Sequence, residues 1–294
     1  MQDCDILHCT DRVSLNVTES VRSQGLEMKR NCGRLLDQIQ VNAPYRKLVD
    51  QYLVLFLEHD INPEIGFDAN SLDRINEESL TAMAHLLAER GRTITLHGPF
   101  MDLAPGGMDE QVRRVSALRL DRTLDLVPFF RARSIVFHAG YDDRRYKAHR
   151  QEWLSRSLAT WGPIIRRAEE IGVVIHLENV YEQAPEMILS LIEAIDSENL
   201  GFCLDVGHMN AFGDAPLREW LDALGPHLRE VHLHDNDGHN DLHGPLGSGT
   251  VPFEELFRHL SNASIKPVIT LEPHEEKSFW QSLESLENLW PWEE

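Results

Sequence analysis

The stretch Gly201-Phe-Cys-Leu-Asp-Val-Gly-His-Met-Asn-Ala-Phe-Gly213 joins a short apolar segment to polar residues that follow it directly. The apolar segment predicts a buried strand that ends at Asp205, with His208 on the turn after it. Carboxylate and neutral imidazole groups both bind zinc, manganese or iron, so this arrangement suits a metal site. Alternatively, Asp205 caps a helix and His208 is a surface residue. The rest of the chain decides between the two interpretations.

Outward from this stretch, short apolar segments alternate with amphipathic ones from about residue 38 onward. Strands are predicted at residues 39–44, 63–68, 93–97, 134–138, 173–178, 201–205, 230–235 and 267–272. Helices are predicted at residues 45–58, 76–89, 109–130, 149–171, 185–195, 216–224 and 252–259, with a last one toward residue 289.

This alternation is typical of parallel βαβ units, in which short strands are covered by helices. Eight such units in roughly 250 residues predict the α/β class and a closed (β/α)8 TIM barrel. An open doubly wound sheet is the competing fold. It would usually carry a Gly-rich turn after its first strand, and Asn42-Ala-Pro-Tyr45 is not one.

The division of the chain follows from its periodicity. Residues 1–36 show no clear pattern and are predicted to form an irregular N-terminal extension without chemistry. No linker or change of composition follows, so residues 37–294 are predicted to form a single barrel domain. The hydrophobic content of 42% and charged content of 26% are ordinary for a soluble protein with a sizeable core.

Composition also limits the compartment and the partners. No apolar segment is long enough to span a membrane, and no secretory signal is visible. Cys4, Cys9, Cys32 and Cys203 have no disulfide-framework spacing, which predicts a reducing, cytoplasmic compartment. The net charge of −20 argues against a nucleic-acid partner, because proteins that grip phosphate backbones normally carry a basic surface. The oligomeric state is left open.

Polar side chains recur at the C-terminal ends of six consecutive predicted strands or directly after them. They are His97, His138, Glu178, Asp205, His208, His232, Asp241, His243 and Glu272. In a barrel these strand ends meet at one rim, where active sites of this fold are built. A single His or Glu there is often an ordinary rim residue, but a run of six strand ends is not explained in that way. Crowded carboxylates repel one another and are costly to bury unless cations hold them together.

Nine ligands are too many for one zinc ion, which takes about four in protein sites. They suit two or three divalent ions with a bridging carboxylate, zinc being the first choice and manganese or iron the alternatives. Closely spaced ions polarise a phosphoryl oxygen and generate hydroxide near neutral pH. The glycines of the 244–249 loop could expose backbone N–H groups to a phosphate, although the same loop could be a plain turn.

Three motifs carry a resemblance to a known family: Cys203-Leu-Asp-Val-Gly-His208, Val231-His-Leu-His-Asp235 and Asp241-Leu-His-Gly-Pro-Leu-Gly-Ser-Gly249. Over residues 38–275 the chain resembles the xylose-isomerase-like TIM-barrel superfamily, and its motifs resemble the endonuclease IV branch (AP endonuclease family 2). That branch holds three zinc ions with His, His, Glu, Asp, His, His, Asp, His and Glu in chain order, the order found here.

The resemblance implies a distribution of these ligands over three ions. Glu178 would bridge two ions, with His97 and His138 completing the first site. The second site would be completed by Asp205, His232 and Glu272, and the third would consist of His208, Asp241 and His243.

Some features depart from the endonuclease pattern. Strand five is followed by Val180-Tyr-Glu-Gln-Ala184 and not by the usual small residues, and the segment from His232 to Asp241 is shorter. The net charge of −20 also suits a DNA-repair enzyme poorly. Sugar isomerases and epimerases of the superfamily keep only the set Glu178, Asp205, His232 and Glu272, so the additional ligands favour phosphoester hydrolysis.

The predicted function is metal-dependent hydrolysis of a phosphodiester in a small or medium-sized molecule, with Glu178 and Glu272 as catalytic residues. A loose resemblance of the 41–45 and 63–68 segments to phosphodiesterases of corrinoid remodelling adds a cobamide to the candidate substrates. Alternatives are a divalent-metal sugar isomerase or epimerase, with the same two glutamates as its acid/base pair, an abasic-site DNA endonuclease, and a binding protein without turnover.

Residues near the candidate ligands are predicted to contact the substrate or to support the ligands. His234 shares a strand face with His232, and Asn179 and His274 lie beside Glu178 and Glu272. These three are the predicted substrate-binding residues, and the expected partner is a small-molecule phosphoester.

Overall fold

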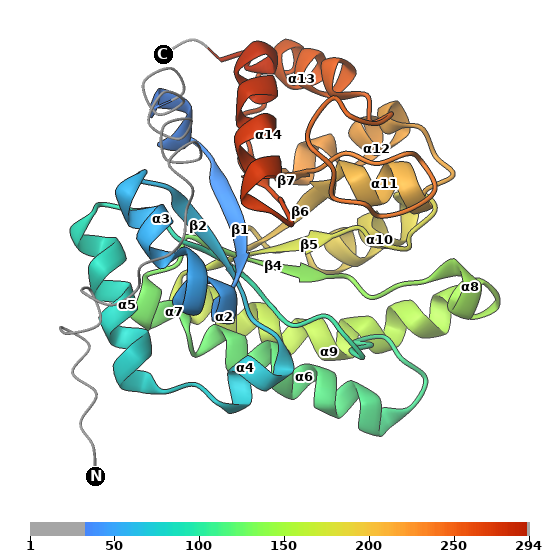
Figure 1. Ribbon diagram of the computed structural model, residues 1–294. Helices are drawn as coiled ribbons and strands as arrows, with labels where there is room; N and C mark the ends of the chain where they lie inside the picture. The colour runs from blue at the N-terminus through green and yellow to red at the C-terminus, as the bar shows by residue number, and fades with distance from the viewer. Residues whose placement is uncertain (1–32, 293–294) are drawn as a thin grey trace.

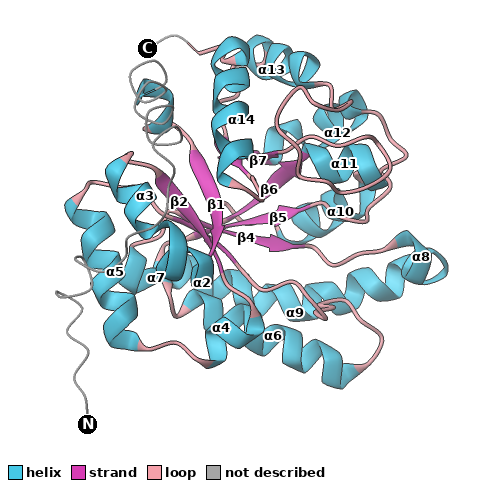
Figure 2. Ribbon diagram, in the orientation of Figure 1, coloured by secondary structure: helices cyan, strands magenta, loops and turns pink. Residues whose placement is uncertain are grey.

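Eight parallel strands, in chain order, close into a barrel in the computed structural model, which describes residues 33–292. Helices surround the strands on the outside (Figures 1 and 2). The strands are β1 Gln40–Pro44, β2 Asn62–Gly66, β3 Thr95–His97, β4 Ser134–His138, β5 Val174–Glu178, β6 Leu200–Asp205, β7 Leu228–Leu233 and β8 Val268–Leu271. Pairing of Gln40 and Val41 with Thr270 and Leu271 closes the barrel, which confirms the predicted TIM barrel.

The helices follow the predicted alternation. They are α2 Tyr45–Lys47, η2 Leu48–Tyr52, α3 Leu53–Glu58, α4 Ala69–Asp73, α5 Glu77–Glu89, α6 Glu110–Leu124, α7 Val127–Phe130, α8 Asp143–Tyr146, η3 Lys147–His149, α9 Arg150–Ile171, α10 Glu186–Ile195, α11 Val206–Phe212, α12 Leu217–Leu224, η4 Gly225–His227, α13 Phe253–Asn262 and α14 Glu276–Leu289.

One predicted helix is divided in the structure. Residues 109–130 form α6 and α7 and not a single helix, and Pro128 lies in the first turn of α7. Proline has no N–H to donate and its ring crowds the carbonyl group four residues earlier, so the first helix ends before it. The short helices α4, α8 and α11 were not predicted, because each is only a turn or two long.

The main core lies between the barrel and its helices. Trp153 and Trp161 of α9 and Trp220 of α12 are fully buried there. Cys203 on β6 is buried and has a free thiol, while the other cysteines lie outside the described residues. Residues 33–36 are helical, and the rest of the predicted N-terminal extension also lies outside the described residues. Across residues 33–292, none of the helices has the length and apolar character needed to cross a membrane.

Candidate metal centre

The C-terminal ends of β3 to β8 bring all nine predicted ligands together at one end of the barrel. His97, His138, Glu178 and Asp205 are the last residues of their strands. His232 lies within β7 and points into the barrel, and Glu272 directly follows β8. His208 lies in α11, and Asp241 and His243 come from the loop after β7. Together with Glu64 and His234, which were not predicted as ligands, they form overlapping groups, within each of which the nitrogen and oxygen atoms are no more than 4.8 Å apart.

The inner group consists of His97, His138 and Glu178. The Nε2 atoms of His97 and His138 lie 3.0 and 3.2 Å from Glu178 Oε2. Burial opposes a charge on Glu178, but the imidazoles around it, His138 foremost, hold its pKa well below the usual range. Burial likewise opposes protonation of His97, yet its hydrogen bond to Glu178 raises its pKa to about 9.

The second oxygen of Glu178 faces a different set of side chains. Oε1 lies 3.1 Å from His208 Nδ1 and 3.6 Å from His232 Nδ1. Each oxygen of this buried carboxylate therefore meets its own pair of imidazoles. A carboxylate in such a position can bridge two cations, as the resemblance implied for Glu178.

Asp205 both caps a helix and joins the cluster, so the helix-cap and metal-ligand interpretations are compatible for this residue. Its Oδ1 accepts a hydrogen bond from the His208 backbone N–H at 2.6 Å and begins α11. Its Oδ2 is buried without a hydrogen-bond partner, 3.6 Å from His208 Nδ1 and 3.9 Å from His232 Nδ1. His208 itself is buried and is not a surface residue.

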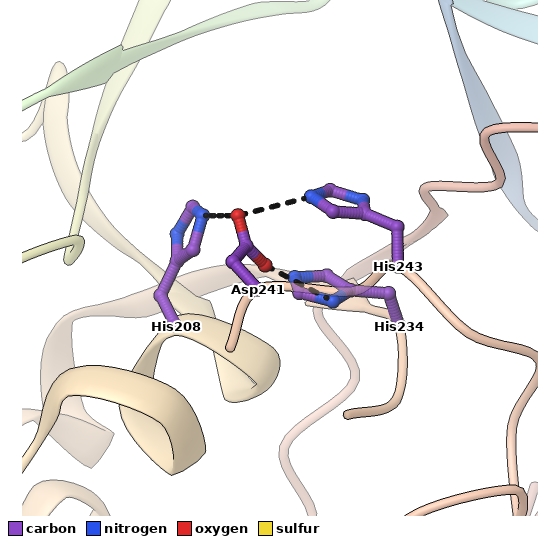
Figure 3. A group of neighbouring side chains, drawn as sticks. All are labelled: His208, His234, Asp241 and His243. Carbon is purple, nitrogen blue, oxygen red and sulfur yellow. Dashed lines mark ion pairs between the residues drawn. The ribbon is translucent and has the colours of Figure 1, made fainter. Parts of the chain in front are cut away.

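The outer group consists of His208, His234, Asp241 and His243 (Figure 3). Asp241 Oδ2 lies 3.4 Å from His208 Nε2 and 3.3 Å from His243 Nε2, and Oδ1 lies 3.6 Å from His234 Nδ1. Burial opposes ionisation of Asp241 and protonation of His243. The hydrogen bond to Asp241 nevertheless raises the pKa of His243 to about 9. His243 has a positive φ of 48°, an uncommon backbone conformation for a non-glycine residue that often accompanies functional sites.

Several buried atoms in this centre have no hydrogen-bond partner within the described chain. They are Asp205 Oδ2, His232 Nδ1 and Nε2, His234 Nδ1 and Asp241 Oδ1. Leaving one buried polar atom unsatisfied costs about 1–3 kcal/mol, and the cost is larger for charged groups. Divalent ions would satisfy most of these atoms, since imidazole and carboxylate suit zinc, manganese and iron alike. The residues therefore fit the metal centre that the sequence predicted.

The predicted substrate-binding residues occupy different positions. His274 is exposed at the rim, and its ring stacks on His243 at 4.1 Å between centroids. His234 is only 1% exposed and stacks on the other face of its neighbour His243, at 3.8 Å, so it lies among the candidate ligands. Asn179 is buried and exchanges two hydrogen bonds of 2.9 Å with the backbone of Asp205, which ties β5 to β6. Substrate contact stays a prediction for all three, and position favours it only for His274.

The glycine-rich loop at residues 244–249 does not offer its N–H groups to a phosphate. Buried Asp235 accepts the backbone N–H groups of Gly247, Gly249 and Val251 at 2.8 to 3.1 Å. The suggestion of a phosphate cradle is therefore wrong for these amides, because a carboxylate of the chain already uses them. Gly244 also pairs with Asp235, which anchors the chain directly after His243.

The mouth of the centre carries aromatic side chains. Phe100 is 47% exposed and stacks on the His138 ring at 4.5 Å, and Phe212 stacks on His208 at 6.1 Å. An apolar surface thus borders the polar centre. A separate cavity of about 640 Å3 lies at the opposite end of the barrel, against the first residues of β7 and β8, and includes none of the candidate ligands.

The sequence interpretation missed two buried carboxylates inside the barrel, Glu64 on β2 and Glu230 on β7. A signal for Glu230 was available, because Glu230, His232 and His234 alternate along the chain and so share one face. Glu64 stands alone in the strand segment Asn62–Gly66, and its partners come from distant parts of the chain.

Together, the fold and the clustered donor atoms define a TIM barrel with a candidate metal centre at its C-terminal rim. The chain belongs to the family described as the xylose isomerase-like TIM barrel, whose model matches residues 63–289. Several proteins with different names are similar to this chain. The protein MJ1311 of Methanocaldococcus jannaschii, which has no named activity, is 33% identical over 61% of this chain and 64% of its own length.

Two named enzymes of different types are also similar. A fructoselysine 3-epimerase of Escherichia coli O157:H7 is 26% identical over 56% of this chain and 61% of its own length. A probable endonuclease 4 of Mycobacterium leprae is 25% identical over 65% of this chain and 77% of its own length.

Solved structures show the same fold. A D-tagatose 3-epimerase-like protein superposes with a TM-score of 0.72 at 26% identity, covering 86% of this chain and 96% of its own. The TTHB071 protein of Thermus thermophilus, whose crystal was soaked with ZnCl2, gives a TM-score of 0.70 at 28% identity, with coverage of 85% and 98%.

Proposed function

We propose that this chain is a metal-dependent phosphodiester hydrolase that acts on a small or medium-sized phosphorylated molecule. The observation that carries the proposal is the outer group, in which Asp241 lies between His208 and His243 at 3.4 and 3.3 Å. A two-glutamate isomerase has no need of this group. Its position beside Glu178 and Asp205 instead supports a centre of two or three ions.

The chain's own residues would divide the work as follows. His97, His138 and Glu178 would hold one ion, and the outer group would hold another. Asp205, His232 and Glu272 would hold the remaining ion, since His232 Nδ1 lies 3.9 Å from Asp205 Oδ2 and 3.1 Å from Glu272 Oε1. When bound, such ions polarise a phosphoryl oxygen and lower the pKa of bound water. Glu178 would hold neighbouring ions at a fixed separation, and the exposed rings of Phe100 and His274 would contact the substrate at the mouth.

The expected substrate is a small molecule and not a nucleic acid. A net charge of −20 disfavours the approach of a long polyanion, whose affinity depends on basic contacts. The aromatic mouth suits a phosphodiester with an apolar or planar part next to the phosphate. A cobamide falls within this class.

The second candidate is a sugar epimerase, favoured by the similarity to the fructoselysine 3-epimerase and the D-tagatose 3-epimerase-like protein. Glu178 Oε1 and Glu272 Oε1 lie 3.6 and 3.1 Å from the same atom, His232 Nδ1. Two carboxylates around one ion could remove a proton from the carbon next to a carbonyl group and return it.

The His243→Ala variant tests the proposed hydrolase. If the outer group holds an ion that stabilises charge in phosphodiester hydrolysis, this variant should lose one ion. Its kcat should fall by on the order of 10²–10³, the scale for removing a major electrostatic stabiliser. Turnover of bis(4-nitrophenyl) phosphate and the metal content per chain are the measurements. An epimerase should tolerate the change far better.

Two controls accompany this experiment. His239→Ala removes an exposed imidazole from the same loop and should leave both measurements unchanged. Glu178→Gln should abolish either activity. A His243→Ala protein with full metal content and an unchanged rate would disprove the three-ion hydrolase, and interconversion of ketoses by the wild type would support the epimerase. Efficient nicking of an abasic duplex at physiological salt would instead identify a DNA endonuclease.

A further inference from the structure

A polar layer lies inside the barrel, next to the metal centre. Asn42, Glu64 and Thr95 are direct neighbours across β1, β2 and β3. Glu64 is completely buried and accepts hydrogen bonds from Asn42 Nδ2 at 2.8 Å and Thr95 Oγ1 at 3.4 Å. Barrel interiors are usually filled by branched apolar side chains. A buried carboxylate in this place is costly unless it has a specific partner.

A second buried carboxylate of the layer, Glu230, is already satisfied by its neighbours. Its Oε2 lies 2.7 Å from His176 Nδ1, and its Oε1 accepts a hydrogen bond from Thr270 Oγ1 at 2.7 Å. Glu230 Oε1 also lies 3.8 Å from His232 Nε2, farther than Glu64 does. Of the two carboxylates, Glu64 therefore lies closer to His232 Nε2.

The two ring nitrogens of His232 face opposite environments. Nδ1 faces the metal centre, 3.1 Å from Glu272 Oε1, whereas Nε2 lies 3.4 Å from Glu64 Oε1, a contact that falls just outside hydrogen-bond geometry here. A neutral imidazole carries one proton and one lone pair, on different nitrogens. With the proton on Nε2, the lone pair of Nδ1 is free to bind a cation. With the proton on Nδ1, that nitrogen cannot be a ligand.

We propose that Glu64 is a positioning residue that accepts the Nε2–H of His232 and so holds this imidazole in the tautomer and orientation in which Nδ1 binds a divalent ion. Carboxylates that accept a hydrogen bond from a metal-bound histidine fix the ring and strengthen it as a ligand. Asn42 and Thr95 hold the carboxylate from the neighbouring strands. The inference needs the metal centre only and applies equally to a hydrolase and to an epimerase.

Metal affinity and tautomer state test this role without any assay of activity. Replacing Glu64 by Ala removes the acceptor, and zinc affinity should fall about 10- to 100-fold, the usual effect of losing such a partner. Glu64→Gln keeps an amide oxygen that can accept the same hydrogen bond, so most of the affinity should return. Zinc affinity is measured by competition with a chromophoric chelator. Nitrogen NMR of the histidine rings reports which nitrogen of His232 carries the proton.

Glu182→Gln is the matched control, because Glu182 is also buried but, among the described residues, accepts the backbone N–H groups of Val180 and Tyr141 and not an imidazole. Its zinc affinity should equal that of the wild type. Unchanged affinity and tautomer in Glu64→Ala would overturn the proposal. Complete loss of an ion in Glu64→Gln would also overturn it, because Glu64 would then be a ligand itself. If Glu64→Ala does not fold, the zinc-loaded wild type decides, since a proton on Nδ1 of His232 contradicts the proposed role.

Discussion

At the scale of single residues, one buried carboxylate outside the candidate ligand groups accepts two backbone N–H groups. Glu182 Oε1 accepts the backbone N–H of Tyr141 at 3.2 Å, and Oε2 accepts that of Val180 at 2.7 Å. It thereby joins the segment after β4 to the segment after β5. Burial raises the pKa of Glu182 to about 7 from an ordinary value of 4.5, although these amides favour its charged form.

This pKa predicts a pH dependence of stability. The folded protein binds the Glu182 proton more tightly than the unfolded chain does. The contribution of this proton to the free energy of unfolding is therefore complete at pH values below the pKa of Glu182 in the unfolded chain. It is lost as the pH rises through about 7. We expect the stability of the wild type relative to Glu182→Gln to fall between about pH 5 and about pH 8. Urea unfolding of both proteins at each pH measures it, and a constant difference would contradict the expectation.

At the scale of elements, the contact between α11 and β7 depends on a glycine. A side chain at Gly207, in the first turn of α11, would overlap the imidazole ring of His234, which follows β7. The same helix presents His208 to the centre. The absence of a side chain at this position therefore lets two imidazoles from different elements approach Asp205 and Asp241 together.

Replacing Gly207 by Ala should displace His234 or push α11 away from β7. Overpacking of this kind typically costs about 1–3 kcal/mol, and we also expect the number of zinc ions bound per chain to fall. Thermal unfolding and metal analysis are the measurements. Gly162→Ala in α9 is the control for metal content, because Gly162 lies outside the candidate ligand groups and, apart from its own helix backbone and chain neighbours, the added methyl group would meet Arg166 Nη1 at 3.5 Å. Pro163 follows Gly162 and disfavours helical backbone for a preceding residue with a Cβ, so this variant is compared for its metal content and not for its stability. Equal metal content in both variants would refute the role of Gly207.

At the scale of the whole molecule, the candidate ligands come from six of the eight strands or the segments that follow them, β3 through β8. Ions at the rim would therefore connect most of the barrel wall. Without them, the clustered carboxylates are balanced only by protons on the imidazoles, several of which have raised pKa values. The negative charge of the chain as a whole adds to this repulsion.

Chelation should lower the melting temperature of the purified protein. A ligand that binds only the folded state stabilises it by about 2.7 kcal/mol at 100 times its Kd, and this stabilisation is lost with the ion. The melting temperature is measured under three conditions: with EDTA, with EDTA that was saturated with zinc beforehand, and after zinc is returned to the EDTA-treated protein. The saturated chelator should have no effect. An identical melting temperature under all three conditions, in protein shown to contain metal, would exclude a stabilising role for the ions.

The sequence by itself determined the barrel and the gathering of nine candidate ligands at one rim. Local patterns specify short apolar strands, and the side chains at their ends must meet once the strands run parallel around a closed barrel. His97, Glu178 and Asp205 could be placed at one rim for this reason alone. The helix boundary before Pro128 was missed, because residues 109–130 were predicted as a single helix.

Only the tertiary structure decided which partner each side chain takes. Glu64 reaches His232 across the barrel interior, and Asp235 uses amides that a local interpretation left for a phosphate. Burial of His234 among the candidate ligands, although it was predicted as a substrate-binding residue, has the same origin. Contacts between residues far apart in the chain depend on the closure of the sheet and the exact depth of each side chain in it. Periodicity gives the face of a strand on which a residue lies, but neither its depth nor its partner across the barrel.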